Sequence, residues 1–155
     1  MSFTLTDRDE ARLEGVEECL VRCIRDAATL CKQPFIVLEG VRLQARQDEL
    51  YAQGRTAPGA IVTWVRTSNH QPKADGKGHA VDLGAIGATG QIDWNHVAPY
   101  ESIKDAMFAA AAKQSPPLKL RWGADWNENG VPQEHGETDL DHFEIEEAAW
   151  AARHP

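Results

Sequence analysis

Residues 98–122, APYESIKDAMFAAAAKQSPPLKLRW, contain both kinds of secondary structure from which we expect the fold to be built. The segment 98–113 is rich in alanine, and its larger apolar residues recur at spacings of three and four, which predicts an amphipathic helix. Pro116-Pro117 ends that helix. In residues 118–122, apolar and basic side chains alternate, as in a strand that buries one of its two faces.

The same kinds of element continue on both sides of this stretch. Thr6 is placed as the N-cap of a first helix, and Pro34 follows its end. We expect helices at 7–31, 43–53 and from 146 onward, and strands at 35–38, 61–65, 79–83 and 142–145. This order predicts an α+β fold in which helices pack on a small, mainly antiparallel sheet.

Length and charge exclude several classes of protein. The chain has 155 residues, which predicts a single compact domain over residues 1–155. Its 16 Lys and Arg against 24 Asp and Glu give a net charge of −8, so nucleic-acid binding through a basic surface is not expected. No apolar run approaches the ~20 residues that span a bilayer, and the acidic N-terminus MSFTLTDRDEARLEG lacks the features of a signal peptide. We therefore expect no membrane insertion and synthesis as a cytoplasmic protein.

The three cysteines lie close together in the first predicted helix. Cys19 and Cys23 are four residues apart and would share a helical face, so a metal site is one interpretation. The favoured interpretation is that they and Cys31 are reduced and act as small core residues, because a disulfide framework does not place its cysteines within one helix.

Two segments combine histidine with carboxylates at useful spacing. The first runs from Ser68-Asn69-His70 to Gly78-His79-Ala80-Val81-Asp82, and the second is 139–144. A catalytic zinc takes three protein ligands and leaves one position for water, whose pKa falls to about 7. A loop histidine, a strand aspartate and a distant histidine supply such a set, and Asp139, three residues before His142, is placed to move a proton. The alternative is that these residues form turns, cap helices or are solvated.

The order Ser-x-His, Gly-x-Ala-x-Asp and acid-x-x-His resembles the M15 family of zinc peptidases. That family includes D-Ala-D-Ala carboxypeptidases and dipeptidases and the phage L-alanyl-D-glutamate endopeptidases. Segments 39–42, 50–56, 90–94 and 118–127 are similar to endolysins of the phage T5 type. The resemblance covers about residues 35–146, which we take as the catalytic core, and implies a hedgehog/D-Ala-D-Ala peptidase-like fold.

The resemblance also implies an activity and a site. We expect a peptidoglycan hydrolase, a phage endolysin with one catalytic Zn²⁺ that cleaves the L-Ala–D-Glu bond of the peptide stem. The alternatives are a D,D-carboxypeptidase or dipeptidase acting on D-Ala-D-Ala, and a non-enzymatic zinc-containing cell-wall binding module related to hedgehog domains. The residues carried over are the zinc ligands His70, Asp82 and His142, the catalytic carboxylate Asp139, Arg42 for charge stabilisation or substrate placement, and Ser68 lining the site.

One departure from the family concerns the first ligand. The family spacing between the first histidine and the aspartate is seven, whereas here it is 12, so five extra residues must bulge out around 72–77. His79 is the rival ligand, but in an extended segment residues 79 and 82 point to opposite faces, which favours His70.

A second metal hypothesis concerns the loop that follows Trp122. Oxygen-bearing side chains alternate before Gly130 as in the first half of an EF-hand loop, although Gly136 stands where the bidentate glutamate would be. The alternative is a polar turn held by Asx hydrogen bonds. Trp122 and Trp126 flank the expected site, where they either contact substrate or pack. The calcium ligands in this hypothesis are Asp125, Asn127, Asn129 and Glu134.

The resemblance to endolysins also sets expectations for the cellular context. We expect a monomer whose partner is peptidoglycan. Without a signal peptide, it would accumulate in the host cytoplasm and act in the periplasm or cell wall after holin-type release.

Overall fold

The computed structural model of the chain describes residues 3–42, 44–61, 69–125, 127–128, 130, 132–133 and 139–153. Its centre is a four-stranded sheet in the order β1-β2-β4-β3, in which every neighbouring pair is antiparallel. The elements are α1 (Asp7–Arg12), α2 (Glu18–Leu30), β1 (Phe35–Glu39), α3 (Gln44–Ala52), β2 (Ala80–Ala85), α4 (Val97–Ala112), β3 (Leu120–Trp122), β4 (His142–Ile145) and α5 (Glu147–Arg153). The predicted α+β class with an antiparallel sheet is confirmed.

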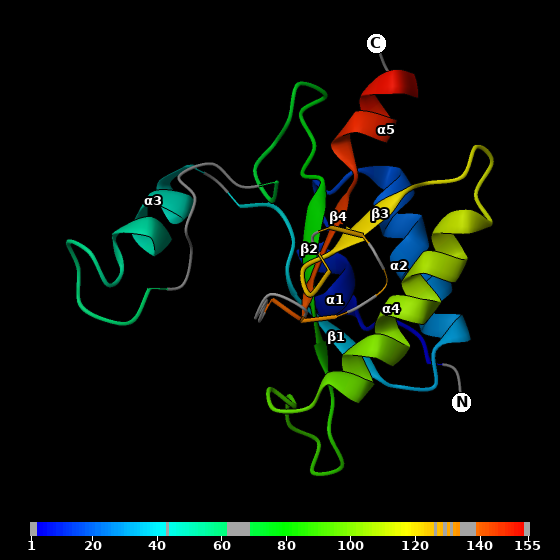
Figure 1. The fold of residues 1–155 in the computed structure, drawn as a ribbon, viewed down its shortest axis with the longest axis horizontal. Helices are drawn as coiled ribbons and strands as arrows, with labels where there is room; N and C mark the ends of the chain where they lie inside the picture. Colours follow the sequence, from blue (N-terminus) through cyan, green and yellow to red (C-terminus); the bar gives the residue numbers. More distant parts are fainter. Residues whose placement is uncertain are drawn as a thin grey trace.

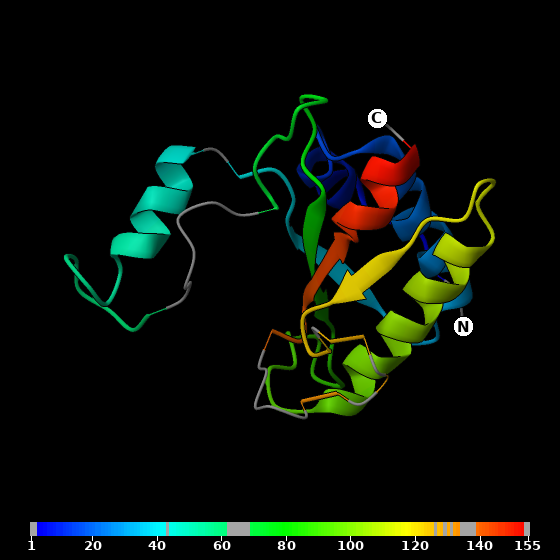
Figure 2. The ribbon, with the colours of Figure 1, turned by 45° about the horizontal axis from the view of Figure 1, so that its top comes forward.

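The two long helices cover one face of the sheet. α2 and α4 lie side by side there, while α3 projects away on the other side (Figures 1 and 2). Alternate residues of β2 and β4 enter the core beneath the helices, namely Val81, Leu83, Ala85, Phe143 and Ile145. Because side chains alternate along a strand, Asp82, His142 and Glu144 lie on the opposite face of the sheet.

The first predicted helix, 7–31, is wrong in one respect, because the structure divides it into α1 and α2. Gly15 has a φ of +84°, a left-handed conformation that interrupts a helix and is unfavourable for other residues. Thr6 is the N-cap as predicted and forms a capping box with Asp9. Asp9 is buried and its carboxylate also accepts a hydrogen bond from Val37 N at 2.9 Å, so the short helix α1 is anchored to β1.

The remaining predicted elements lie within a few residues of their predicted bounds, except the strand at 61–65, of which residues 62–65 lie outside the described residues. The cysteines are free thiols: Cys23 and Cys31 are buried in the core, and Cys23 Sγ lies 3.2 Å from Met107 O. Within the described part of the chain, no group of potential metal ligands includes a cysteine.

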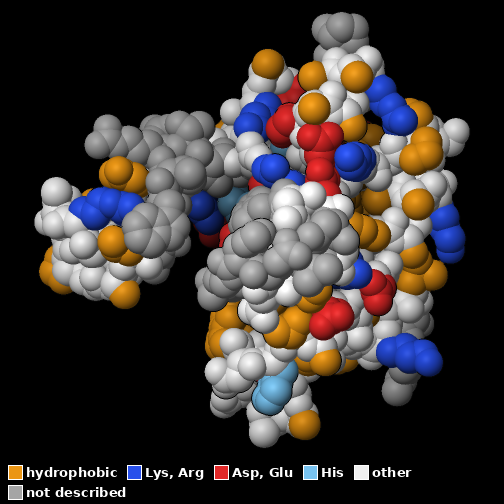
Figure 3. All heavy atoms as spheres, viewed as in Figure 1, with side chains coloured by type: hydrophobic (Ala, Val, Ile, Leu, Met, Phe, Trp, Pro, Cys, Tyr) orange, Lys and Arg blue, Asp and Glu red, His pale blue; other side chains and the backbone are white. Residues whose placement is uncertain are grey.

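The surface agrees with the charge pattern of the sequence. On the face shown in Figure 3, Lys and Arg side chains are interspersed with Asp and Glu and do not gather into one basic surface. None of the described helices is long and apolar enough to cross a membrane.

Candidate metal centre

The centre of the site is Asp82, in the middle of the sheet. In the antiparallel registers, its Cα pairs with Glu39 of β1 on one side and with His142 of β4 on the other. His70 comes from the loop before β2 and reaches the same face of the sheet. Its Nδ1 lies 2.8 Å from Gly40 O, and its own carbonyl accepts a hydrogen bond from Arg42 N at 2.8 Å. The main chain after β1 therefore contacts both the ring and the backbone carbonyl of His70.

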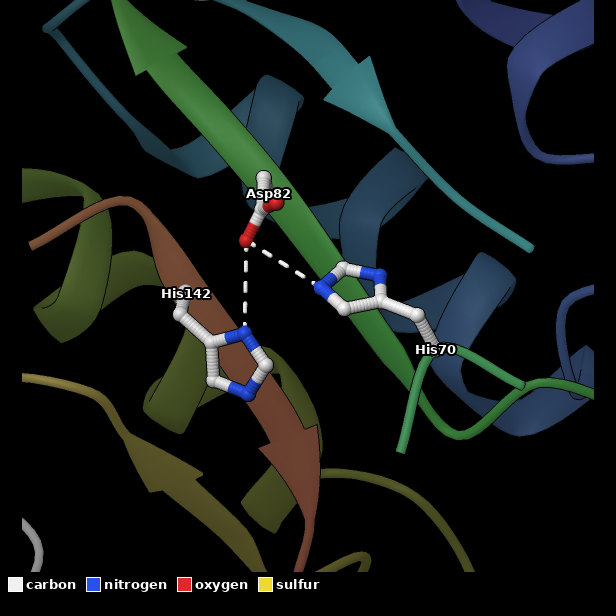
Figure 4. A group of neighbouring side chains, drawn as sticks. All are labelled: His70, Asp82 and His142. Carbon is white, nitrogen blue, oxygen red and sulfur yellow. Dashed lines mark hydrogen bonds and ion pairs between the residues drawn. The ribbon is translucent and has the colours of Figure 1, made fainter. Parts of the chain in front are cut away.

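The three predicted ligands converge on one point (Figure 4). Asp82 Oδ1 lies 3.3 Å from His70 Nε2 and 3.3 Å from His142 Nδ1, and the three ligand atoms are all within 4.8 Å of one another. With zinc–ligand bonds of about 2.0–2.1 Å, two ligand atoms of a tetrahedral site lie about 3.3–3.4 Å apart. Two nitrogens and one carboxylate oxygen at this spacing therefore fit a zinc ion with one position left open.

Two further carboxylates adjoin this group. Asp139 and Asp141 each offer an oxygen within 4.8 Å of the other and of Asp82. Asp139 is exposed, whereas the histidine ligands are buried, so this carboxylate lies on the solvent side of the ligand group. The arrangement combines three residues that could hold a metal ion with an accessible carboxylate that can exchange protons.

Comparison with known proteins identifies the family. The profile of the phage L-alanyl-D-glutamate peptidases matches residues 1–146. The chain belongs to this family. It is 31% identical over 130 residues to the L-alanyl-D-glutamate peptidase of Escherichia phage T5, covering 84% of this chain and 86% of the relative.

Two bacterial proteins are also similar to this phage-family peptidase. The peptidoglycan L-alanyl-D-glutamate endopeptidase CwlK of Bacillus subtilis (strain 168) is 31% identical over 91 residues, which are 59% of this chain and 53% of CwlK. The crystal structure of the Serratia marcescens L-Ala D-Glu endopeptidase ChiX superposes with a TM-score of 0.72 at 30% identity, covering 96% of this chain and 94% of ChiX. The resemblance recognised from the sequence motifs is confirmed, and with it the expectation of a peptidase.

Burial and hydrogen bonds determine the ionisation of Asp82 and His142 in this peptidase. Burial opposes the charge of Asp82, but hydrogen bonds from His142 and His70 outweigh it and lower the pKa of this carboxyl. Burial likewise opposes a charged His142, but its bonds to Asp82 and Glu144 raise its pKa to about 10 in the metal-free protein. In the metal-free protein, a protonated His142 therefore supplies the positive charge beside Asp82 and Glu144.

The pKa values of the two neighbouring carboxyls, Asp139 and Asp141, are raised, in contrast to that of Asp82. Desolvation by the protein packed around Asp139 and repulsion from Asp82 raise its pKa, although the residue as a whole is exposed. Burial and the charges of Asp82 and Asp139 raise the pKa of Asp141 to about 8. Three carboxylates packed together cannot all ionise freely, so this cluster readily holds a proton.

Arg42 lies behind the ligand group. Its guanidinium donates to both carboxylate oxygens of Glu39, at 2.9 and 2.7 Å, and to Gln47 Oε1 at 2.8 Å. It also lies 3.8 Å from Asp82 Oδ2, and its side chain is only 10% exposed. These contacts place a fixed positive charge beside Asp82, and the role of Arg42 in charge stabilisation or substrate placement stays a prediction.

Other predicted residues lie apart from the ligand group or outside the described chain. His79 is buried, and its two ring nitrogens contact Asp75 at 2.8 Å and Glu147 at 3.0 Å. In the loop after β3, Asp125 Oδ2 accepts a hydrogen bond from Gly130 N at 2.8 Å. Asn127 is exposed. Ser68, Trp126, Asn129 and Glu134 lie outside the described residues, so the calcium site remains a prediction.

Sequence reasoning gave no role to two residues of the site, Asp141 and Glu144. Glu144 follows His142 by two positions on a strand, so the alternation of side chains predicts that both share a face. That signal was present in the sequence. Asp141 lies in the turn before β4, where no periodicity reveals which way a side chain points.

Proposed function

We propose that this chain is a zinc-dependent peptidoglycan endopeptidase that hydrolyses the L-Ala–D-Glu bond of the peptide stem. The observation that carries the proposal is the spacing of 3.3 Å from Asp82 Oδ1 to His70 Nε2 and to His142 Nδ1, with the Asp139 carboxylate beside them. The phage T5, CwlK and ChiX relatives are all named as peptidases of the L-Ala–D-Glu bond, which supports this choice of bond.

The protein's own groups account for the proton transfers. Zinc, when bound by His70, Asp82 and His142, supplies Lewis-acid activation of water and of the scissile carbonyl. Asp139 accepts the proton of the attacking water and returns it to the leaving amine, a task suited to a carboxylate whose pKa is raised. Arg42 keeps Asp82 ionised and oriented through its charge at 3.8 Å.

The role of Asp139 is tested by separating metal binding from hydrolysis. Purified wild type and Asp139→Asn are compared for zinc content and for lysis of outer-membrane-permeabilised Gram-negative cell walls. Asp105→Asn, on the exposed side of α4, is the matched control because it makes the same change outside the site. We expect about one zinc in all three proteins and loss of lysis in Asp139→Asn alone.

The products decide which bond is cleaved. New N-terminal D-Glu on the released muropeptides identifies the endopeptidase, whereas release of D-Ala identifies a D,D-carboxypeptidase or dipeptidase. Zinc binding by wild type without any new amino groups overturns the enzymatic function and leaves a cell-wall binding module.

The cellular part of the proposal is endolysin function during host lysis. A monomer stored in the host cytoplasm would reach peptidoglycan after holin-type release. Expression in a Gram-negative host with and without a co-expressed holin tests it: lysis that depends on the holin is expected, and lysis without it contradicts this route.

A further inference from the structure

Glu144 lies beneath the ligand group and is 3% exposed. Oε1 accepts a hydrogen bond from His142 Nε2 at 2.8 Å. Oε2 accepts two more, from Arg121 at 2.8 Å and from Asn69 Nδ2 at 2.7 Å. A buried carboxylate is costly unless it is paired and hydrogen-bonded, and Glu144 meets both conditions.

These three donors come from three separate parts of the fold. His142 lies two positions before Glu144 on the same face of β4, and Arg121 is its Cα partner on β3. Asn69 belongs to the loop before β2 and directly precedes His70. One carboxylate therefore connects the segments that carry the first and the last predicted zinc ligands.

The contact with His142 also decides which ring nitrogen faces the metal. Because a carboxylate only accepts, Nε2 must carry a hydrogen, and a neutral ring then has its lone pair on Nδ1. Nδ1 is the nitrogen that lies 3.3 Å from Asp82 Oδ1. An acceptor on the outer nitrogen of a ligating histidine fixes its tautomer and raises its basicity.

We propose that Glu144 is a positioning residue that holds His142 in the Nε2–H tautomer, so that Nδ1 binds the metal, and that it sets the position of His70 through Asn69. This inference rests on the zinc site proposed above. Glu144 itself contacts neither metal nor substrate and acts through the ligand.

The substitution Glu144→Gln tests this because a carboxamide cannot replace all three contacts. If its oxygen faces His142, its NH₂ group meets the donors of Arg121 and Asn69. If the amide is turned, it donates to His142 Nε2, which places the ring hydrogen on Nδ1 and blocks metal binding there. Glu101→Gln, exposed on α4 at the opposite face of the sheet, is the matched control.

The first measurement is the zinc dissociation constant, determined by competition with a chelator, together with thermal unfolding of the metal-free proteins. We expect Glu144→Gln to weaken zinc binding by about 10–100-fold, as for other residues that support metal ligands, and Glu101→Gln to leave it unchanged. Failure of wild type to bind zinc overturns the proposed function itself. Wild-type zinc binding with equal affinity in Glu144→Gln overturns only the role of Glu144.

The second measurement is the ¹⁵N spectrum of the histidine rings in the zinc-bound proteins, which a general loss of stability does not alter in this way. Wild type should show His142 with zinc on Nδ1 and hydrogen on Nε2, and Glu144→Gln should show that pattern lost or mixed. If Glu144→Gln does not fold, Asn69→Ala removes one bond to the carboxylate without touching His142. A weaker zinc affinity in that variant then supports the inference, and an unchanged affinity overturns it.

Discussion

We predict that His142 makes the stability of the metal-free protein and its affinity for zinc respond to pH in opposite directions. Hydrogen bonds to Asp82 and Glu144 overcome the effect of burial and raise its pKa from 6.5 to about 10. A raised folded-state pKa stabilises the fold fully below pH 6.5, and this contribution is lost as the pH rises toward 10. Zinc, in contrast, must displace the proton on Nδ1, so its binding improves over the same range.

The size of both effects follows from the shift. The rise in the His142 pKa from 6.5 to about 10 corresponds to about 5 kcal/mol of unfolding free energy in the metal-free protein. This is a large part of the stability of a typical domain. Asp141 also makes the metal-free protein less stable as the pH rises, because burial and its neighbours' charges raise its pKa to about 8. With one proton displaced from His142, the apparent zinc affinity rises about tenfold per pH unit between roughly pH 7 and 9.

The assay combines urea unfolding with and without a chelator and zinc competition titrations at pH 6.5, 7.5, 8.5 and 9.5, corrected for protonation of the chelator. Calorimetry in two buffers of different ionisation enthalpy counts the protons released. His96→Gln is the control, because the His96 side chain is 72% exposed and contacts Asp93 rather than a predicted ligand. A zinc affinity that is flat between pH 7 and 9, with metal-free stability equally flat, refutes the reasoning.

Two further predictions concern the packing around the site, and a third concerns removal of the metal. A Cβ on Gly123 would overlap the Asp139 carbonyl and lie 3.0 Å from His142 Cβ, so Gly123→Ala should lower kcat by about 10–100-fold. Gly87→Ala is the control, because its Cβ would make only ordinary contacts and kcat should not change. Equal rates in the two variants contradict this prediction. Phe143 is fully buried between the two site residues of β4, and Phe143→Ala should lower the unfolding free energy by about 3–5 kcal/mol in urea titrations, with a change below 1 kcal/mol arguing against it. Removal of zinc by a chelator should abolish wall hydrolysis and lower the Tm, both restored by added zinc; full activity in excess chelator contradicts the zinc mechanism.

The sequence predicted the sheet best where apolar and polar side chains alternate along a strand. In 118–122 the alternation places Leu118, Leu120 and Trp122 on one face, and the structure has all three in the core. The division of the first helix was missed because apolar residues continue at helical spacing on both sides of Gly15. Periodicity reports which face is buried, and it does not report a change in helix direction.

The site was less accessible from local patterns. His70, Asp82 and His142 were selected by the order of motifs along the chain, since no local rule shows that a loop and two strands meet. Apart from the shared strand face of His142 and Glu144, the supporting contacts could be found only in three dimensions. Arg42, for example, contacts Glu39 and Gln47, and no pattern in the sequence indicates either contact.

The extra residues between His70 and Asp82 illustrate how an insertion leaves a site intact. Lys73 N donates to Lys77 O at 2.8 Å and Pro72 pairs with Gly78, so the inserted segment closes on itself and returns to its starting point. The spacing of 12 residues therefore does not displace Asp82 from His70.

The same insertion accounts for the rival histidine. Asp75, within the inserted segment, and Glu147, at the start of α5, contact the two ring nitrogens of His79, which is 2% exposed. Each ring nitrogen of His79 contacts a carboxylate other than Asp82, so the geometry favours His70 as the first ligand. His79 instead links the inserted segment to the last helix, and the resulting contact lies on the side of the strand away from Asp82.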